Sequence, residues 1–413
     1  MTIVSLLKSQ TALTFTALPP LSLYIHVPWC VRKCPYCDFN SHEVKGGVKG
    51  GTKGGGGGGA IPEQEYVAAL IADFEQTLPR VWGRRISTVF FGGGGTPSLL
   101  SGAAVDAILA AVRARLPLAP DAEITLEANP GTVEAERFRE YRTAGVNRLS
   151  LGIQSFNPQH LKALGRIHDD SEARRAIDIA RAHFDNFNLD VMYGLPQQTL
   201  PQALADIEAA LAFEPPHLSA YHLTLEPNTL FHRYPPKLPD DDTAAEMQNE
   251  IEALLAAHGY ENYETSAFAK PGKRCAHNLN YWLFGDYIGI GAGAHGKITS
   301  HAGIAREARF RQPAQFMEKA RAGNAVQTTN TVTAADAGFE FMMNALRLGQ
   351  GFEVSLIAER AGVPLTALLK PLAEAERRQF ITRDHQRVAP TLLGRRFLNE
   401  LLQIFLPEKA ASV

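Results

Sequence analysis

Apolar runs and amphipathic segments alternate along the first half of the chain. The apolar runs are rich in β-branched and aromatic residues and predict strands at 23–27, 86–91, 123–128, 147–153, 187–192 and 217–223. The segments between them carry apolar residues at helical spacing and predict helices at 62–78, 101–116, 132–144, 171–183 and 200–213. Because each strand–helix pair has the length of a βα unit, the pattern predicts a parallel sheet.

The alternation weakens beyond about residue 235. One helix is predicted over 240–258, and from residue 331 onward the pattern is mostly helical, with a small hairpin at 380–388 and an apolar closing helix at 392–406. We therefore expect an α/β protein: a partial (β/α)6 barrel, open rather than closed into eight units, followed by a mostly α-helical C-terminal domain. Helices with a short wing would make that last domain similar to a winged helix.

The same pattern suggests how the chain is divided. We expect a leader at 1–20, the partial barrel at 21–235, an accessory region that acts as a lid at 236–330, and the helical domain at 331–413. Residues 45–59 contain ten glycines and three lysines. Such a segment has little apolar surface to bury, so we expect a flexible loop inside the barrel domain.

Composition and charge narrow the classes of function. The 41 Lys and Arg residues nearly balance the 43 Asp and Glu residues, which gives a formal net charge of −2. This balance argues against general phosphate-backbone binding, so we expect no nucleic-acid partner. No apolar run approaches the roughly 18 residues that a membrane span needs. A signal peptide fits the N-terminus poorly, and we expect a cytoplasmic location.

Three of the four cysteines lie within eight residues of one another. Cys30, Cys34 and Cys37 have the spacing CxxxCxxC, whereas Cys275 is distant in the sequence. Clustered thiols in an enzyme-sized chain indicate metal or redox chemistry in a reducing compartment. Three thiolates on one loop can hold three corners of a [4Fe–4S] cluster and leave the fourth iron open to a small molecule.

A zinc site is the alternative at this loop. Zinc prefers four protein ligands, and His26 and His42 flank the cysteines closely enough in sequence to complete a set. Unligated structural thiols are a second alternative. The CxxxCxxC spacing is unusual both for a zinc site and for unligated structural thiols.

The wider run of residues carries a resemblance to a known family. CxxxCxxC with an aromatic residue, Tyr36, before the last cysteine is the signature of radical S-adenosylmethionine (SAM) proteins. Residues 23–42 look like the branch that holds the oxygen-independent coproporphyrinogen-III oxidase, and within it the haem chaperone W family. The resemblance extends from about Pro20 to the C-terminus and departs at the leader and at the glycine-rich loop. It implies a [4Fe–4S] cluster on Cys30, Cys34 and Cys37, with SAM at the open iron.

The resemblance also implies a SAM-binding set. A glycine loop, 92–97, follows the predicted strand 86–91, and glycines at a strand end let backbone groups approach a ligand closely. Parallel barrels build their sites at the carboxyl ends of their strands, where several of the family positions fall. The positions that match the family's SAM-binding residues are Tyr24, Gly94, Gly95, Thr96, Glu127, Gln154, Arg166 and Asp190.

Two features favour the haem chaperone branch over the oxidase. The oxidase carries a fourth cysteine two residues after the third, and this chain has Phe39 there. Residues 277–282 match an HNxxYW motif that the family associates with haem binding, which implies a haem site at His277, Asn278, Tyr281 and Trp282. Imidazole is a suitable haem-iron ligand, and aromatic rings pack against a porphyrin. Cys275 and His295 lie near this motif in sequence, without a role that the sequence itself assigns.

The implied function is a haem chaperone that carries a [4Fe–4S] cluster and SAM and delivers haem to acceptor haemoproteins. Membrane-associated acceptors and a peripheral membrane location are compatible with this function. Two alternatives stay open at this point. One is a radical SAM enzyme that acts on a tetrapyrrole, as the coproporphyrinogen III oxidase does, and the other is a zinc-binding module. Whether SAM cleavage is turned over is a question that the residues leave open.

Overall fold

The computed structural model describes residues 13–44, 61–132 and 135–407. The glycine-rich loop expected at 45–59 lies outside these residues, as does most of the leader expected at 1–20. The remaining leader residues are not isolated from the rest of the chain. Leu13 and Phe15 pack against the core of the C-terminal domain, and the Thr14 N–H donates to the Gly362 carbonyl at 3.1 Å.

A twelve-stranded sheet organises the described chain, in the order β14-β13-β12-β11-β1-β4-β5-β6-β7-β8-β10-β9. Its strands are β1 (Leu21–His26), β4 (Ile86–Gly92), β5 (Leu118–Ala128), β6 (Arg148–Gln154), β7 (Phe187–Tyr193), β8 (His217–His222), β9 (Glu261–Glu264), β10 (Ala267–Ala269), β11 (Asp286–Ile290), β12 (His295–Ser300), β13 (Gly303–Arg309) and β14 (Val326–Thr331). Two short strands flank the cysteine loop and pair in parallel: β2 (Trp29–Cys30) and β3 (His42–Glu43).

Helices connect and cover these strands. They are α1 (Glu63–Val81), α2 (Gly102–Arg113), α3 (Ala135–Ala144), α4 (Pro158–Ala163), α5 (Asp170–His183), α6 (Leu200–Leu211), α7 (Leu230–Arg233), α8 (Asp241–Ala257), α9 (Ala276–Trp282) and α10 (Pro313–Arg321).

The strands from β11 through β8 run parallel to their neighbours, and the two ends of the sheet, β14 and β9, are not paired with each other. All six strands predicted in the first half are present, as β1 and β4 to β8. Their apolar residues face helices on the outside and other side chains on the inside, which is why the strands read as nearly continuous apolar runs. The expected α/β partial barrel is confirmed.

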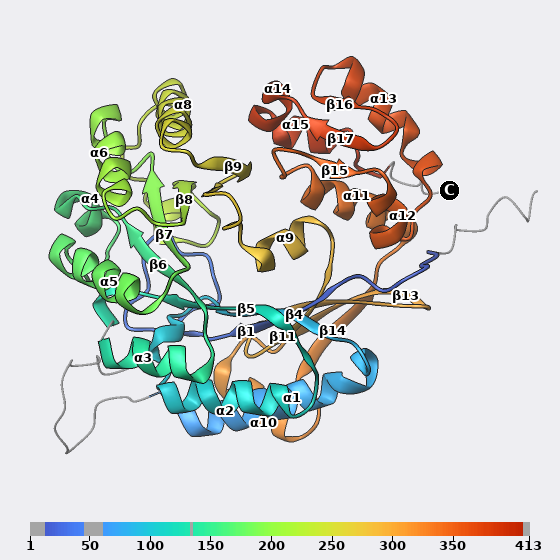
Figure 1. The fold of residues 1–413 in the computed structure, drawn as a ribbon, viewed down its shortest axis with the longest axis horizontal. Coiled ribbons are helices and arrows are strands. Elements are labelled where there is room, and N and C mark those ends of the chain that lie inside the picture. Colours follow the sequence, from blue (N-terminus) through green and yellow to red (C-terminus); the bar gives the residue numbers. More distant parts are fainter. Residues whose placement is uncertain (1–12, 45–60, 133–134, 408–413) are drawn as a thin grey trace, which may run out of the picture.

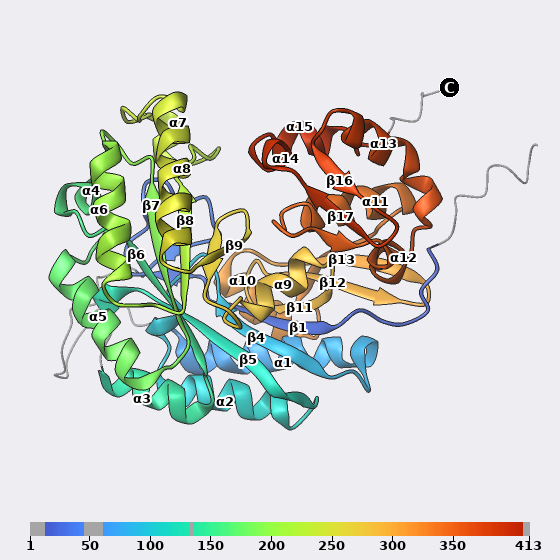
Figure 2. The same ribbon diagram turned by 45° about the horizontal axis from the view of Figure 1, so that its top comes forward.

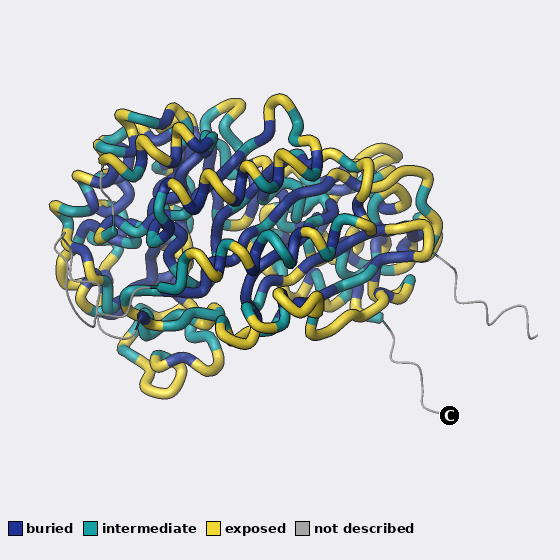
Figure 3. Tube along the Cα trace, turned by 90° about the horizontal axis from the view of Figure 1, so that it is seen from below, coloured by how far each residue is buried: buried dark blue, intermediate teal, exposed yellow. Residues whose placement is uncertain are grey.

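The helices lie in separate layers (Figure 1). One face of the sheet is covered by α1, α2 and α10, whereas α9 lies on the opposite face with the C-terminal domain above it. The view in Figure 2 shows the same arrangement, with α9 between the sheet and that domain. The central strands are buried and the outward turns of the helices are exposed (Figure 3). None of the helices in the described ranges is long and apolar enough to cross a membrane.

The region 236–330 is more than a lid. It supplies β9 and β10 to one end of the sheet and β11 to β14 to the other. β11 pairs in parallel with β1, while β12, β13 and β14 continue in antiparallel order. The sequence pattern did not predict these strands because several of them carry polar residues and glycines, which antiparallel strands at the end of a sheet accommodate.

The C-terminal domain has a core of its own. Its elements are α11 (Ala334–Ala345), β15 (Phe352–Glu353), α12 (Ser355–Ala361), α13 (Leu369–Arg377), β16 (Ile381–Arg383), β17 (Arg387–Pro390), α14 (Leu392–Arg396) and α15 (Leu398–Gln403). The predicted hairpin is present as β16 and β17, and β15 completes a three-stranded sheet.

The single closing helix predicted at 392–406 is wrong. Phe397 has a non-helical backbone (φ −107°, ψ 44°) that separates α14 from α15. The two halves pack against different surfaces: Gly394 of α14 lies against the Phe380 carbonyl, whereas Leu401 of α15 is buried in the domain core. Apolar spacing alone did not indicate this break.

Candidate functional site

The cysteine loop joins β1 to β3 at the carboxyl end of the parallel strands. Cys30, Cys34 and Cys37 are free and half-buried, and the Cys37 N–H donates to the Cys34 carbonyl at 3.1 Å, which closes a tight turn. Burial and the neighbouring thiols of Cys37 and Cys34 raise the pKa of Cys30 to about 12. The three sulfur atoms therefore share one partly desolvated environment on a single loop.

The glycine loop after β4 packs directly against the backbone of the cysteine loop. A Cβ atom on Gly94 would lie 2.4 Å from the Asn40 backbone, and one on Gly95 would lie 2.3 Å from the Trp29 carbonyl oxygen. The Thr96 N–H donates to that same carbonyl at 2.7 Å. Any side chain at Gly94 or Gly95 would displace the cysteine loop, so these glycines position the thiols as well as leaving room for a ligand.

Arg166 connects the end of β6 with the cysteine loop. Its Nη2 donates to the Gly152 carbonyl at 2.6 Å, and its Nη1 lies 3.8 Å from the Cys34 sulfur. Its Nε is buried without a hydrogen-bond partner. A Cβ on Gly152 would meet the Gln154 amide at 3.1 Å as well as the Arg166 guanidinium at 3.4 Å. The side chains of Gln154 and Arg166, both predicted to bind SAM, therefore lie together beside Gly152.

Glu127 ends β5 with no ion-pair partner among the residues that the structure describes. Burial and the negative charge of Asp190 raise the pKa of Glu127 to about 8, against the opposing effect of the Gly93 backbone amide. Asp190 itself accepts hydrogen bonds from Ser150 at 3.1 Å and Asn188 at 2.9 Å. The charge of Arg148 also opposes the rise, but Arg148 forms no ion pair with Glu127 among the described residues. A desolvated carboxyl beside another carboxyl, without an ion-pair partner, is suited to receive the ammonium group of a ligand.

An open cavity of about 860 Å³ adjoins these elements. Tyr24, His26, Gly93, Gly94 and Glu127 line part of its wall. The Tyr24 hydroxyl lies 3.0 Å from His26 Nδ1, so these two side chains hold each other at the wall. Residues of α9, of the strands β11 to β14 and of the edge of α11 also line it. The volume is within the range of about 300–1,000 Å³ that is common for ligand sites.

The structure divides the HNxxYW motif. Tyr281 and Trp282 line the cavity, whereas His277 and Asn278 do not. His277 is 1% exposed; its Nδ1 lies 2.8 Å from the Thr88 hydroxyl and its Nε2 lies 3.1 Å from the Tyr281 hydroxyl. Its ring also stacks on Phe90, and burial lowers the pKa of His277 to about 3. In this conformation His277 has no free ring nitrogen, and it positions the Tyr281 hydroxyl instead.

Trp282 reaches the cavity with its ring held from behind. The Arg347 guanidinium of the C-terminal domain lies 4.3 Å from the centre of that ring, and the buried indole N–H has no hydrogen-bond partner. Cys275, by contrast, is buried next to Glu123, with its sulfur 3.4 Å from a carboxylate oxygen, and it does not line the cavity. A ligand role for Cys275 therefore has no geometric support.

The donor set fits an iron–sulfur cluster and SAM better than zinc. Each thiolate of a [4Fe–4S] cluster binds its own iron, so three half-buried sulfurs on one loop suffice. Zinc needs its ligands at one point, and no three His, Cys, Asp or Glu side chains of the described ranges form such a group. His26 and His42 bond instead to Asn40, at 3.3 Å each. For SAM, the unpaired Glu127 and the free Arg166 Nε match an ammonium and a carboxylate.

Sequence reasoning missed Asn40 and the side chains of the strands added by 286–311. Asn40 Nδ2 donates to the carbonyls of Ala292 at 2.9 Å and Arg311 at 3.0 Å, which fastens the cysteine loop to the segments that follow β11 and β13. Tyr287 and Arg306 line the cavity from β11 and β13. No spacing motif marks these residues, since they meet the cysteine loop only because β11 pairs with β1.

Comparisons with known proteins agree with this site. A family model described as "Radical SAM superfamily" matches residues 24–210, and one described as "HemN C-terminal domain" matches residues 332–397. "Heme chaperone HemW" of Escherichia coli is 50% identical over 95% of this chain and 99% of its own length. The proteins of the same name from Haemophilus influenzae and Bacillus subtilis are 44% and 34% identical, each over 99% of its length.

A solved structure shares the fold. It carries the description "Coproporphyrinogen III oxidase (HemN) from Escherichia coli is a Radical SAM enzyme" and superposes with a TM-score of 0.77, covering 94% of this chain and 90% of its own. The sequences are 23% identical in that comparison, so the likeness establishes the architecture of both domains and leaves the activity to the site.

Proposed function

Because the chain belongs to the HemW heme chaperone family of the radical SAM superfamily, we propose that it binds haem and delivers it to acceptor haemoproteins. The observation that carries the proposal is the 50% identity to the heme chaperone of Escherichia coli over 95% of this chain. Similarity of this extent spans the cysteine loop, the cavity and the C-terminal domain together. Delivery to membrane-associated acceptors and a cytoplasmic location, including at the membrane surface, belong to the same proposal.

The cofactors of the proposal are a [4Fe–4S] cluster and SAM, bound at the cysteine loop and the adjoining wall of the cavity. Cys30, Cys34 and Cys37 would hold the cluster, and Gly94, Gly95 and Thr96 fix the loop that carries them. Bound together, the cluster and SAM supply one-electron chemistry at the open iron. The remaining residues proposed to bind SAM are Tyr24, Glu127, Gln154, Arg166 and Asp190.

The cavity offers flat apolar surface for haem. Tyr281 and Trp282 line it, and Tyr281 packs edge-on against Tyr287 with ring centres 4.6 Å apart. His277 contributes by holding the Tyr281 hydroxyl, and Asn278 lies next to it on α9. Aromatic rings fixed in this way provide contact area with little loss of side-chain entropy on binding.

A radical enzyme acting on a tetrapyrrole is the second candidate. The thiol loop, together with the unpaired Glu127 on the cavity wall, favours this candidate. Against it stands Phe39, which occupies the position of the oxidase's fourth cysteine and lines the cavity with 64% of its surface exposed.

The test begins with anaerobic reconstitution of the full chain. We expect about four irons and four sulfides per chain, haem binding seen as a shift of the Soret band, and transfer of that haem to an apo-haemoprotein. A Cys30→Ser, Cys34→Ser, Cys37→Ser variant should lose the iron and sulfide. Bound zinc without sulfide would reject the cluster, and a wild-type protein that binds no haem would reject the chaperone function. Formation of 5′-deoxyadenosine with a consumed tetrapyrrole would favour the enzyme instead.

A further inference from the structure

A haem-binding protein needs groups for three parts of its ligand: the iron, the carboxylates and the flat ring. The HNxxYW motif supplies surface for the ring but no available iron ligand, because both nitrogens of His277 are hydrogen-bonded inside the protein. His26 and His295 also line the cavity, and both ring nitrogens of His26 have hydrogen-bond partners. His295 is the imidazole with free nitrogens.

His295 begins β12 and lines the cavity, near enough to His26 for their charges to interact. Its side chain is exposed, and neither ring nitrogen has a hydrogen-bond partner among the described residues. Partial burial, with the positive charges of Arg311, Arg306 and Arg309 nearby, lowers the pKa of His295. The imidazole is therefore neutral near pH 7, which is the form that donates a lone pair to iron.

The arginines near His295 differ in how they are paired. Arg309 is buried and bound to Asp73 and Glu307. The Arg306 Nε donates to Glu340 at 3.0 Å, and its Nη1 donates to the Tyr287 hydroxyl at 2.7 Å. Arg311 also lines the cavity, and its exposed guanidinium has no carboxylate partner among the described residues. Arg311 is the cation available to a carboxylate of the ligand.

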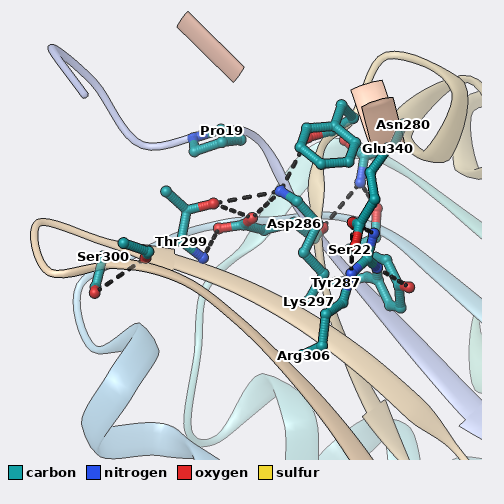
Figure 4. Close-up of polar contacts among 12 residues, drawn as sticks. Pro19, Ser22, Asn280, Asp286, Tyr287, Lys297, Thr299, Ser300, Arg306 and Glu340 are labelled. Atoms are coloured by element: carbon teal, nitrogen blue, oxygen red, sulfur yellow. Dashed lines mark hydrogen bonds and ion pairs between the residues drawn. The ribbon is translucent and has the colours of Figure 1, made fainter. Parts of the chain in front are cut away.

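Buried polar contacts join the strands β11 and β12, which form part of this wall (Figure 4). Lys297 donates to Asp286 at 2.8 Å and to the Phe284 carbonyl at 3.1 Å, and the Thr299 hydroxyl also donates to Asp286, at 2.7 Å. The strands β11 and β12 are thus joined by buried polar contacts directly behind the cavity. His295, one pleat further along β12, projects from a fixed strand rather than from a mobile loop.

Part of the cavity wall is apolar. Phe39 is 64% exposed although it is a large aromatic residue, and it lines the cavity together with Trp282. Asn40, next to Phe39, is hydrogen-bonded to the Ala292 and Arg311 carbonyls, so the cysteine loop is tied to the segment that carries Arg311. An exposed aromatic side chain at the mouth of a cavity indicates a surface that a flat apolar ligand covers.

From these placements we propose that haem binds in the cavity, with His295 as the iron ligand and Arg311 at a porphyrin carboxylate. The inference rests on the proposed haem-chaperone function and adds to it the residues that recognise the cargo. It places the iron ligand on the sheet, at β12, rather than on the HNxxYW helix.

The experiment compares three histidine variants in the reconstituted full chain. Each is titrated with haemin under anaerobic conditions, and the Soret band and the electron paramagnetic resonance of the iron are recorded. We expect His295→Ala to weaken binding by about tenfold or more and to lose the spectrum of an imidazole-ligated iron. Added imidazole should restore that spectrum. His277→Ala should keep the imidazole-ligated spectrum, and the matched control His385→Ala, on an exposed turn, should behave as wild type.

The carboxylate contact is tested with a second ligand. Arg311→Gln should weaken haemin binding by about tenfold, whereas haemin dimethyl ester, which lacks free carboxylates, should bind both proteins alike. Arg321→Gln, on α10 and outside the cavity, is the matched control. Equal weakening of both ligands by Arg311→Gln would overturn the carboxylate assignment.

The outcomes separate this inference from the proposed function. If the wild type binds haemin and His295→Ala keeps its affinity and spectrum, the inference is overturned while the chaperone function stands. If only His277→Ala loses the imidazole-ligated spectrum, the inference is likewise overturned, and the iron ligand lies on α9. If the wild type binds no haemin, the proposed function itself fails.

Discussion

At the scale of single residues, Glu127 is the group whose surroundings most clearly anticipate a ligand. It is a carboxyl at the end of β5, close to Asp190, with no ion-pair partner in the described chain. Proteins rarely leave a buried charge without a partner, because desolvation costs several kcal/mol. The protein therefore keeps Glu127 partly protonated until a cation arrives.

This predicts a pH dependence of SAM binding. The pKa of Glu127 is raised to about 8, so below that pH the carboxyl must lose its proton before it can pair with the ammonium group. Affinity for SAM should therefore rise with pH between about pH 6 and 7.5, by at most about tenfold per unit. Isothermal titration of the reconstituted protein across this range measures the slope.

Glu127→Gln should bind SAM about 1–3 kcal/mol more weakly and should lose the slope, because its amide does not titrate. Iron content is measured in parallel to show that the cluster is intact. Glu136→Gln, at an exposed position of α3, is the matched control and should keep both affinity and slope. A wild-type affinity that is flat with pH would contradict the role given to Glu127.

At the scale of elements, the glycine loop and the cysteine loop form one packed unit. Gly94 and Gly95 have no room for a Cβ because backbone atoms of Asn40 and Trp29 lie within 2.4 Å of where it would be. We expect Gly94→Ala to reduce the iron and sulfide bound after reconstitution by more than half, since the displaced loop would no longer present its thiols correctly. Far-ultraviolet circular dichroism should show that the fold is retained.

Gly338→Ala provides the matched comparison. Gly338 lies within α11, where the nearest atom to a new Cβ is the end of the Leu368 side chain at 3.3 Å. Alanine is favoured over glycine inside a helix by roughly 0.5–1 kcal/mol, so this substitution should not disturb the fold. Because Gly338 does not touch the cysteine loop, the variant should bind a full cluster. Full cluster content in Gly94→Ala as well would contradict the packing role of the glycine loop.

The junction of β11 and β12 is a second unit at this scale. Asp286 is fully buried and accepts from Lys297, Arg84 and Thr299. Burial opposes the ionised form, but these partners outweigh it and lower the pKa of Asp286. A carboxyl whose pKa is lowered by folding stabilises the protein above its unfolded pKa, and that contribution is lost as the pH falls through the folded pKa.

Asp286→Asn should therefore lower the free energy of unfolding by about 3–5 kcal/mol near pH 7, because it leaves the Lys297 ammonium buried with its charge unpaired. Urea denaturation followed by fluorescence measures the change. Asp178→Asn, at an exposed position on α5, should change stability by less than about 0.5 kcal/mol. An equally small change in Asp286→Asn would show that the polar contacts of Asp286 contribute little to the free energy of unfolding.

At the scale of the whole molecule, the cavity forms where three parts of the chain meet. The parallel strands bring the cysteine loop and Glu127, the antiparallel extension brings His295 and Arg306, and the C-terminal domain supports Trp282 through Arg347. Each of the three parts also packs against residues outside the cavity. The shape of the cavity therefore depends on how the three parts dock with one another.

The likeness to the solved oxidase structure also leads to a prediction about an activity that this protein lacks. The solved structure described as a coproporphyrinogen III oxidase has the same architecture, but this chain has Phe39 where the resemblance places a fourth cysteine. We expect the chain not to restore haem synthesis in cells that lack the oxidase, and Phe39→Cys alone not to create that activity, since substrate positioning needs many contacts. Growth of such cells on the wild-type gene at ordinary expression would contradict this prediction.

The sequence by itself determined the parallel strands, the cysteine loop and the family. Strand and helix periodicity is local, so β1 and β4 to β8 could be read from apolar spacing, and CxxxCxxC needs only eight consecutive residues. The positions proposed to bind SAM came from the resemblance to the radical SAM family, whose short motifs have counterparts in this sequence.

Only the tertiary structure decided which of the remaining side chains face the cavity. His277 and His295 are both histidines near one motif, and nothing in their local sequence tells that Thr88 and Tyr281 occupy the ring nitrogens of one while the other stays free. Likewise, Arg311 meets the cysteine loop because β11 pairs with β1, across more than 250 residues of sequence. Contacts of this kind depend on the docking of distant segments, which local periodicity does not encode.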